Sequence, residues 1–216
     1  MDRDNFLHPE NWRGGPSYKL SMAWTPGDDA HLLRALRVLA AAPGLRGPWA
    51  NPGHFPAPTA PPRMLDRQRG YKGYGLLRLQ DGTELGCLML AMLSQRGPEG
   101  DDANADWLEL VVMRGMQERA FGVVYSDYFR RDNPWFDQID AQYLALAEAV
   151  YAAAPFTFAV IDHEGLPYGS SPQAIITAQL DRGGLLLPPP IFARVARQDG
   201  WVTLRSGLRW LPPREG

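Results

Sequence analysis

Three consecutive side chains, Asp162, His163 and Glu164, have the types needed for joint chemistry. An imidazole between two carboxylates could act as a general base or bind a divalent cation. The triplet ends the apolar, β-rich run Phe156–Asp162, which is typical of a central strand whose end reaches a cleft. Neighbours along a strand point to opposite faces, so Asp162 and His163 converge only if the chain turns there. A polar strand exit before Gly165 is the alternative interpretation.

A second group is an acidic stretch that contains no lysine or arginine. Its carboxylates are Glu99, Asp101, Asp102, Asp106 and Glu109. A patch of one sign speeds association with a partner of the opposite sign and selects for it. The stretch therefore predicts a docking site for a basic protein, with a solvated loop between two strands as the alternative.

The remaining candidates for chemistry are isolated in the sequence. Cys87 is the single cysteine and lies in an apolar run, which favours a buried structural thiol over a reactive one. His8, His31 and His54 are scattered, and nothing in the sequence brings them together. Glycine-rich phosphate loops, nucleophile elbows and zinc-hydrolase motifs do not occur, so we expect no cofactor and no metal.

Composition sets the broad class of the protein. The chain has 216 residues, of which 45% are hydrophobic and 21% charged, with a net charge of −2. These values are typical of a globular protein and argue against non-specific nucleic-acid binding. The charged start Met1–Asp4 and the absence of any run of 18 apolar residues predict no membrane partner and a cytoplasmic location. We expect one domain over residues 1–216.

Local patterns predict two helices and the strands beside them. Tyr18–Trp24 alternates between apolar and polar residues, as a half-buried strand does. Thr25 as an N-cap and Pro26 in the first turn predict a helix that runs to about Ala42. Asn133 as an N-cap predicts a second amphipathic helix, which ends before Pro155.

Further patterns predict a hairpin and a long connection. Leu76–Gln80 and Glu84–Leu93 flank Asp81-Gly82, a dipeptide typical of type I′ turns. The second of these strands is apolar on both faces, which indicates a central strand covered on both sides. The Pro/Gly-rich segment 43–70 predicts a long loop that Trp49 and Phe55 could pin to the body.

These elements together predict an α+β fold. We expect a mainly antiparallel sheet of about six strands with the two amphipathic helices on one face, including strands at Trp107–Met113 and within Trp201–Trp210. Two similar β-α-β-β halves are an alternative arrangement.

Parts of the stretch from Tyr18 to Glu164 resemble bacterial proteins proposed as immunity factors against polymorphic toxins. The resemblance rests on the opening strand and helix up to Leu36, on Trp107–Leu110 and on Val150–Phe156. It implies stoichiometric binding of a toxin without catalysis, and it carries over no functional residue.

Three hypotheses of function follow. The leading one is a non-enzymatic protein-binding domain, an immunity protein that neutralises a toxin or another basic protein at Glu99, Asp101, Asp102 and Asp106. The alternative is a hydrolase-like enzyme that uses Asp162 and His163 in a cleft covered by segment 43–70. The third is a small-ligand module with an apolar pocket between sheet and loop, lined by Trp24 or Trp49.

Overall fold

The computed structural model describes residues 1, 3–12, 17–27, 29–55, 57, 59–94, 105–122, 133–163, 171–196 and 199–214. The strands are β1 Ser17–Trp24, β2 Leu45–Trp49, β3 Tyr71–Arg78, β4 Glu84–Met92, β5 Asp106–Met113, β6 Phe158–Asp162, β7 Leu185–Leu187, β8 Val202–Thr203 and β9 Arg209–Leu211. The helices are α1 Arg3–Leu7, α2 Ala30–Ala41, α3 Arg114–Phe121, α4 Trp135–Ala153, α5 Pro172–Arg182 and α6 Pro189–Phe192, with short 3-10 turns η1 Pro9–Trp12 and η2 Pro52–His54.

All these strands belong to one sheet. Their order is β2-β3-β4-β5-β1-β6-β7-β9-β8, and each pairing is antiparallel. The predicted α+β class and antiparallel sheet are confirmed. The expected number of about six strands is wrong, because the described residues form a sheet of nine, and the two predicted helices are also fewer than the helices that the described residues contain. The order also does not divide into two β-α-β-β halves, since β2, β3 and β4 follow one another with only the 3-10 turn η2 between them.

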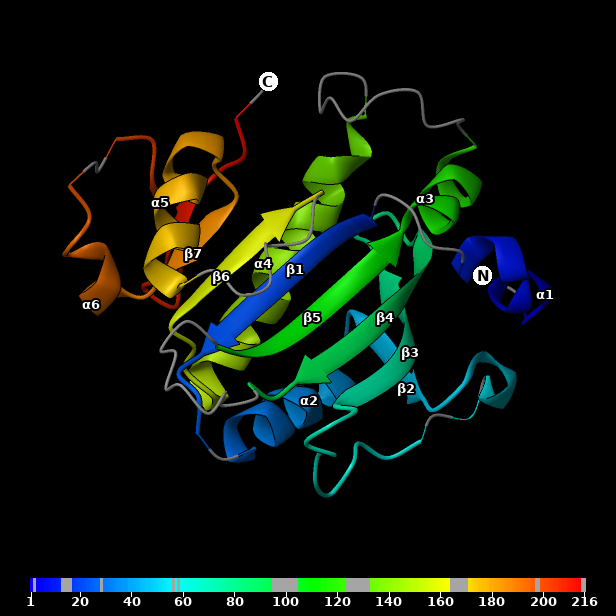
Figure 1. Ribbon diagram of the computed structural model, residues 1–216. Coiled ribbons are helices and arrows are strands. Elements are labelled where there is room, and N and C mark those ends of the chain that lie inside the picture. Colours follow the sequence, from blue (N-terminus) through cyan, green and yellow to red (C-terminus); the bar gives the residue numbers. More distant parts are fainter. Residues whose placement is uncertain are drawn as a thin grey trace.

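One face of the sheet carries the main core. Helices α2 and α4 lie side by side on that face, as Figure 1 shows behind the strands. The alternation of β1 directs Tyr18, Leu20, Met22 and Trp24 into this core, where each is at most 4% exposed. In β4 the residues of this face are buried, whereas Leu88, Leu90 and Met92 on the other face are half-buried. The cover expected on both sides of β4 is therefore incomplete.

Among the described residues, helices cover the opposite face only towards its two ends. Helix α5 packs against β6 and β7 through Ile175 and Ile176, and α1 lies at the β2–β3 end, where Phe6 contacts Trp49 (Figure 1). No described helix crosses the middle of this face, over β1 and β5.

Segment 43–70 is more regular than the predicted loop. It contains η2 and the edge strand β2, where Pro48 is tolerated because an edge strand leaves one side of its backbone unpaired. Trp49 is fully buried and Phe55 packs against it, with ring centroids 5.2 Å apart. These two aromatics therefore pin the segment as predicted.

Both helix starts differ from the prediction. Helix α2 begins at Ala30 rather than after Thr25, because the backbone N–H of Gly27 donates to Asp106 and holds the chain out of the helix. Helix α4 begins at Trp135, with Pro134 rather than Asn133 at the N-cap position.

The hairpin between β3 and β4 forms as predicted, but its turn is of another class. Only Gly82 has a positive φ, of 88°, so Asp81 does not adopt the left-handed conformation that a type I′ turn requires. Leu79 N–H donates to Thr83 O and Gly82 N–H to Leu79 O, which leaves a three-residue loop with glycine at the bulge.

Candidate functional site

The predicted pair Asp162 and His163 is split between the two faces of the sheet. Oδ2 of Asp162 accepts a hydrogen bond from Nε2 of Gln179 on α5, at 3.2 Å. The His163 ring packs on the other side against Tyr18 and Phe136, with centroids 4.7 and 4.4 Å away. The two side chains therefore do not converge on one substrate position.

The predicted acidic group is only partly described. Glu99, Asp101 and Asp102 lie outside the described residues, and so does Glu164 of the triplet. Asp106 does not lie on the surface as a docking role would need, because it is 1% exposed. Glu109 is equally buried and accepts a hydrogen bond from Oγ of Ser21 at 3.1 Å.

Asp106 instead organises one corner of the molecule from the inside. Its Oδ1 accepts from Ser94 N–H at 2.7 Å, and its Oδ2 accepts from Gly27 N–H at 3.2 Å. Nε2 of His31 lies 3.1 Å from Oδ2 but without hydrogen-bond alignment, and the His31 ring stacks on Trp24 with centroids 5.5 Å apart. The start of β5, the exit of β4 and the approach to α2 thus meet at one carboxylate.

Two hollows lie at this corner, and the end of segment 43–70 borders both. The smaller has a volume of about 450 Å³, and its lining residues are Pro26, Gly27, Arg67, Gln68, Leu93, Ser94 and Asp106. The larger, of about 700 Å³, is lined by Asp29, Met64, Leu65, Asp66, Arg67 and Leu93. We call the two together the corner groove. Neither hollow is lined by Trp24 or Trp49, so the apolar pocket predicted around those residues is not found here.

The rim that carries Arg67 is held by local hydrogen bonds. Oδ1 of Asp66 accepts from the backbone N–H of Gln68 at 2.8 Å and of Arg69 at 3.0 Å. Both bonds lower the pKa of the Asp66 carboxyl, and the bond from the Arg69 N–H has the larger effect. Gly70 closes the turn with a φ of 64°, and a β-carbon there would lie 2.2 Å from Ala91 O. The turn therefore presents the Arg67 and Gln68 side chains from a fixed backbone.

The groups at the corner groove suit recognition better than catalysis. They are the carboxylates of Asp29, Asp66 and Asp106 with one guanidinium, one amide and one hydroxyl, whereas His31 does not line either hollow. Burial raises the pKa of the Cys87 thiol, which lies in the core. Within the described part of the chain, no three His, Cys, Asp or Glu side chains come together as metal ligands would. Sequence reasoning selected Asp106 for another role and had no signal for Arg67 or His31.

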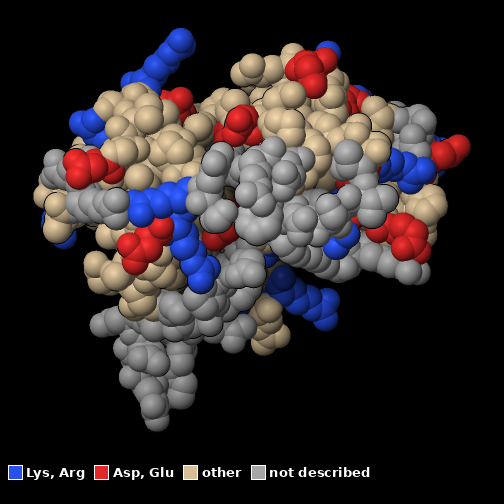
Figure 2. Space-filling model, turned by 90° about the horizontal axis from the view of Figure 1, so that it is seen from above, with Lys and Arg blue, Asp and Glu red and all other residues tan. Residues whose placement is uncertain are grey.

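Charges elsewhere are mixed. Figure 2 shows acidic and basic side chains interspersed over the described part of the upper end of the molecule. The helices within the described ranges include none with the length and apolar character of a membrane span. Comparison with protein-family models, with curated proteins and with solved structures found no match to this chain.

Proposed function

We propose that this chain is a non-enzymatic protein-binding domain and that its partner docks along the corner groove. The observation that carries the proposal is the position of Met64, which is 77% exposed at the edge of the 700 Å³ hollow. Large exposed apolar side chains beside a hollow are typical of contact surfaces, and the flexible thioether of methionine adapts to varied partners.

The acidic residues of the sequence also support docking of the partner at the corner groove. The segment between Ser94 and Ala105 carries Glu99, Asp101 and Asp102. The described residues on its two sides, Ser94 and Asp106, both line the smaller hollow. A basic partner would gain attraction from these carboxylates and apolar contact from Met64.

The finer proposal for the partner is a protein toxin that the chain neutralises by stoichiometric binding. It rests on the sequence resemblance to immunity factors and on the separation of Asp162 from His163, which removes support from the hydrolase-like alternative.

Co-expression with the products of adjacent genes tests this function, with growth rescue and co-purification as readouts. Met64→Asp should weaken binding at least about tenfold, because a charge replaces an apolar contact. Val202→Asp is the matched control, since Val202 is the other large exposed hydrophobic of the described chain and lies on β8, away from the groove. If no neighbouring product binds, or if Val202→Asp weakens binding as much as Met64→Asp, the proposal is wrong.

A further inference from the structure

We propose that the 450 Å³ hollow is a binding site for a small zwitterion of amino-acid size. Asp106 would accept hydrogen bonds from the ammonium group, and Arg67 would donate hydrogen bonds to the carboxylate; both residues line the hollow. This inference goes beyond the proposed function and needs no protein partner.

Asp106 has acceptor capacity left for a ligand. A carboxylate offers about four lone-pair positions. The backbone N–H groups of Ser94 and Gly27 occupy two of them, and Nε2 of His31 lies 3.1 Å from Oδ2 without hydrogen-bond alignment. The carboxylate is buried yet lines the hollow. An ammonium group that reached an unoccupied position from the hollow would form a charged hydrogen bond, which is stronger in a shielded site than in water.

The second charge in the hollow selects against ligands of a single sign. Arg67 is a cation, so a lone ammonium compound or metal ion would gain from Asp106 but face repulsion from the guanidinium. A simple anion would gain from Arg67 but face Asp106. A molecule that carries both charges satisfies both groups at once, and the guanidinium can bind its carboxylate through two parallel hydrogen bonds.

The rest of the hollow fits the remainder of such a molecule. Pro26 and Leu93 offer apolar wall for a short aliphatic side chain, and Gln68 and Ser94 offer further polar groups. The volume lies within the range of about 300–1,000 Å³ that is typical of small-molecule sites. It has room for an amino acid or a dipeptide.

The experiment is calorimetric titration of the full chain with each of the twenty amino acids. The tightest binder is then compared with two analogues, the amine that lacks its carboxylate and the acid that lacks its ammonium group. We expect binding of the zwitterion at millimolar concentration or below, and at least about tenfold weaker binding of each analogue.

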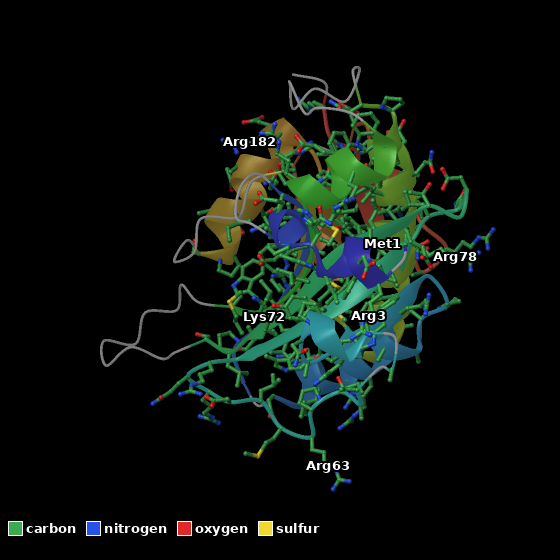
Figure 3. The ribbon with its side chains drawn as sticks, turned by 90° about the vertical axis from the view of Figure 1, so that its right-hand side faces the viewer. Met1, Arg3, Arg63, Lys72, Arg78 and Arg182 are labelled. Carbon is green, nitrogen blue, oxygen red and sulfur yellow. The ribbon has the colours of Figure 1, made fainter. Side chains whose placement is uncertain are left out.

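Two arginine variants test whether the zwitterion binds in this hollow. Arg67→Gln should weaken zwitterion binding at least about tenfold and should strengthen binding of the amine, because the guanidinium that repels the ammonium group is gone. Arg63→Gln is the matched control, because Arg63 belongs to the same segment but projects away from the body, at the bottom of Figure 3. Both arginines are exposed, so neither change should affect folding.

Three results would overturn the inference. They are no binding by any amino acid up to about 10 mM, equal binding of the acid analogue, or equal losses in Arg67→Gln and Arg63→Gln. Met64 does not line this hollow, so Met64→Asp should leave zwitterion binding intact. The same variant therefore separates failure of this site from failure of the proposed protein-binding function.

Discussion

Nε2 of His31 lies 3.1 Å from Oδ2 of Asp106, which joins the first turn of α2 to the first residue of β5. The contact arises because β1 and β5 pair with Trp24 opposite Asp106, so that the chain leaving β1 passes the carboxylate on its way to α2. The backbone N–H groups of Gly27 and Ser94 donate to the same side chain. Asp106 is thus a structural hub as well as a wall of the smaller hollow.

Replacement of Asp106 by asparagine should therefore lower the free energy of unfolding by about 2–3 kcal/mol. In asparagine an NH₂ group replaces one of the two carboxylate oxygens. The backbone N–H that donated to that oxygen would then face another donor and would be buried without a partner. Urea denaturation measures the change. Asp181→Asn on α5 is the control, since Asp181 is exposed, and its effect should stay within about 0.5 kcal/mol. An equal effect of the two changes would show that Asp106 does not hold the corner together.

A second buried polar contact joins β1 to α4. The Tyr18 hydroxyl donates to Oδ1 of Asp140, and the Tyr143 hydroxyl donates to Tyr18 O at 3.0 Å. Tyr18→Phe should cost about 1.5–3 kcal/mol of stability, because it removes a donor from a buried carboxylate. The control is Tyr151→Phe. Tyr151 lies on α4, as Asp140 does, but it is half-buried, so its replacement should cost less than about 0.5 kcal/mol. Thermal and urea unfolding of both variants give the comparison, and similar losses would contradict the assigned role of the Tyr18 hydroxyl.

Sequence patterns predicted the elements whose signal is local. The alternation of Tyr18–Trp24 and the turn at Asp81-Gly82 each lie within a few residues, and both elements formed. Helix α5 was missed, although Ser171 before Pro172 is a helix-start signal and its Oγ accepts from Ala174 N–H at 3.2 Å. Strand β2 was missed because Pro48 argues against a strand except at an edge.

The corner groove could not be predicted from the sequence, for a different reason. Its residues come from four separate stretches of the chain, and only the order of strands in the sheet brings them together. Asp106 illustrates the difficulty, since the sequence grouped it with the carboxylates Asp102 and Glu109, whereas its neighbours in space are hydrogen-bond donors. No spacing rule connects Arg67 with Asp106.

Gly70 and Gly82 allow a matched test of the turn that presents Arg67. Both have positive φ, so alanine at either position should cost about 1 kcal/mol in backbone strain. Only at Gly70 would the new β-carbon lie 2.2 Å from Ala91 O, whereas nothing lies within 4 Å at Gly82. Gly70→Ala should therefore be the more destabilising change in urea denaturation and should displace Arg67. Equal stability of the two variants would mean that the backbone around Gly70 moves away from Ala91 O without loss of folding free energy.

The single thiol should be inert in the folded protein. Cys87 is fully buried, and burial raises its pKa, so little thiolate forms near neutral pH. A thiol reagent such as DTNB should modify wild-type protein only as fast as it unfolds. Val202→Cys adds a thiol at a position whose valine is 50% exposed, and that thiol should react within minutes. Rapid modification of Cys87 at neutral pH would show that β3 and β4 open locally.

Stability should fall as the pH rises from about 10 to 12, in part through Tyr71. Burial raises the pKa of Tyr71 to about 12 from its ordinary value of 10.0. A raised folded-state pKa stabilises the fold fully below the unfolded value, and this contribution is lost as the pH rises towards the folded value. Because the side chain is partly exposed, solvent screening reduces the loss to about 1 kcal/mol.

Tyr71→Phe isolates that contribution from those of the other tyrosines. The Tyr71 hydroxyl has no hydrogen-bond partner among the residues that the structure describes, so its removal should leave stability at pH 7 nearly unchanged. Denaturation of both proteins between pH 8 and 12 should then show a shallower decline for the variant. Parallel declines would mean that Tyr71 ionises equally well in the folded and unfolded chains, which its burial against the core argues against.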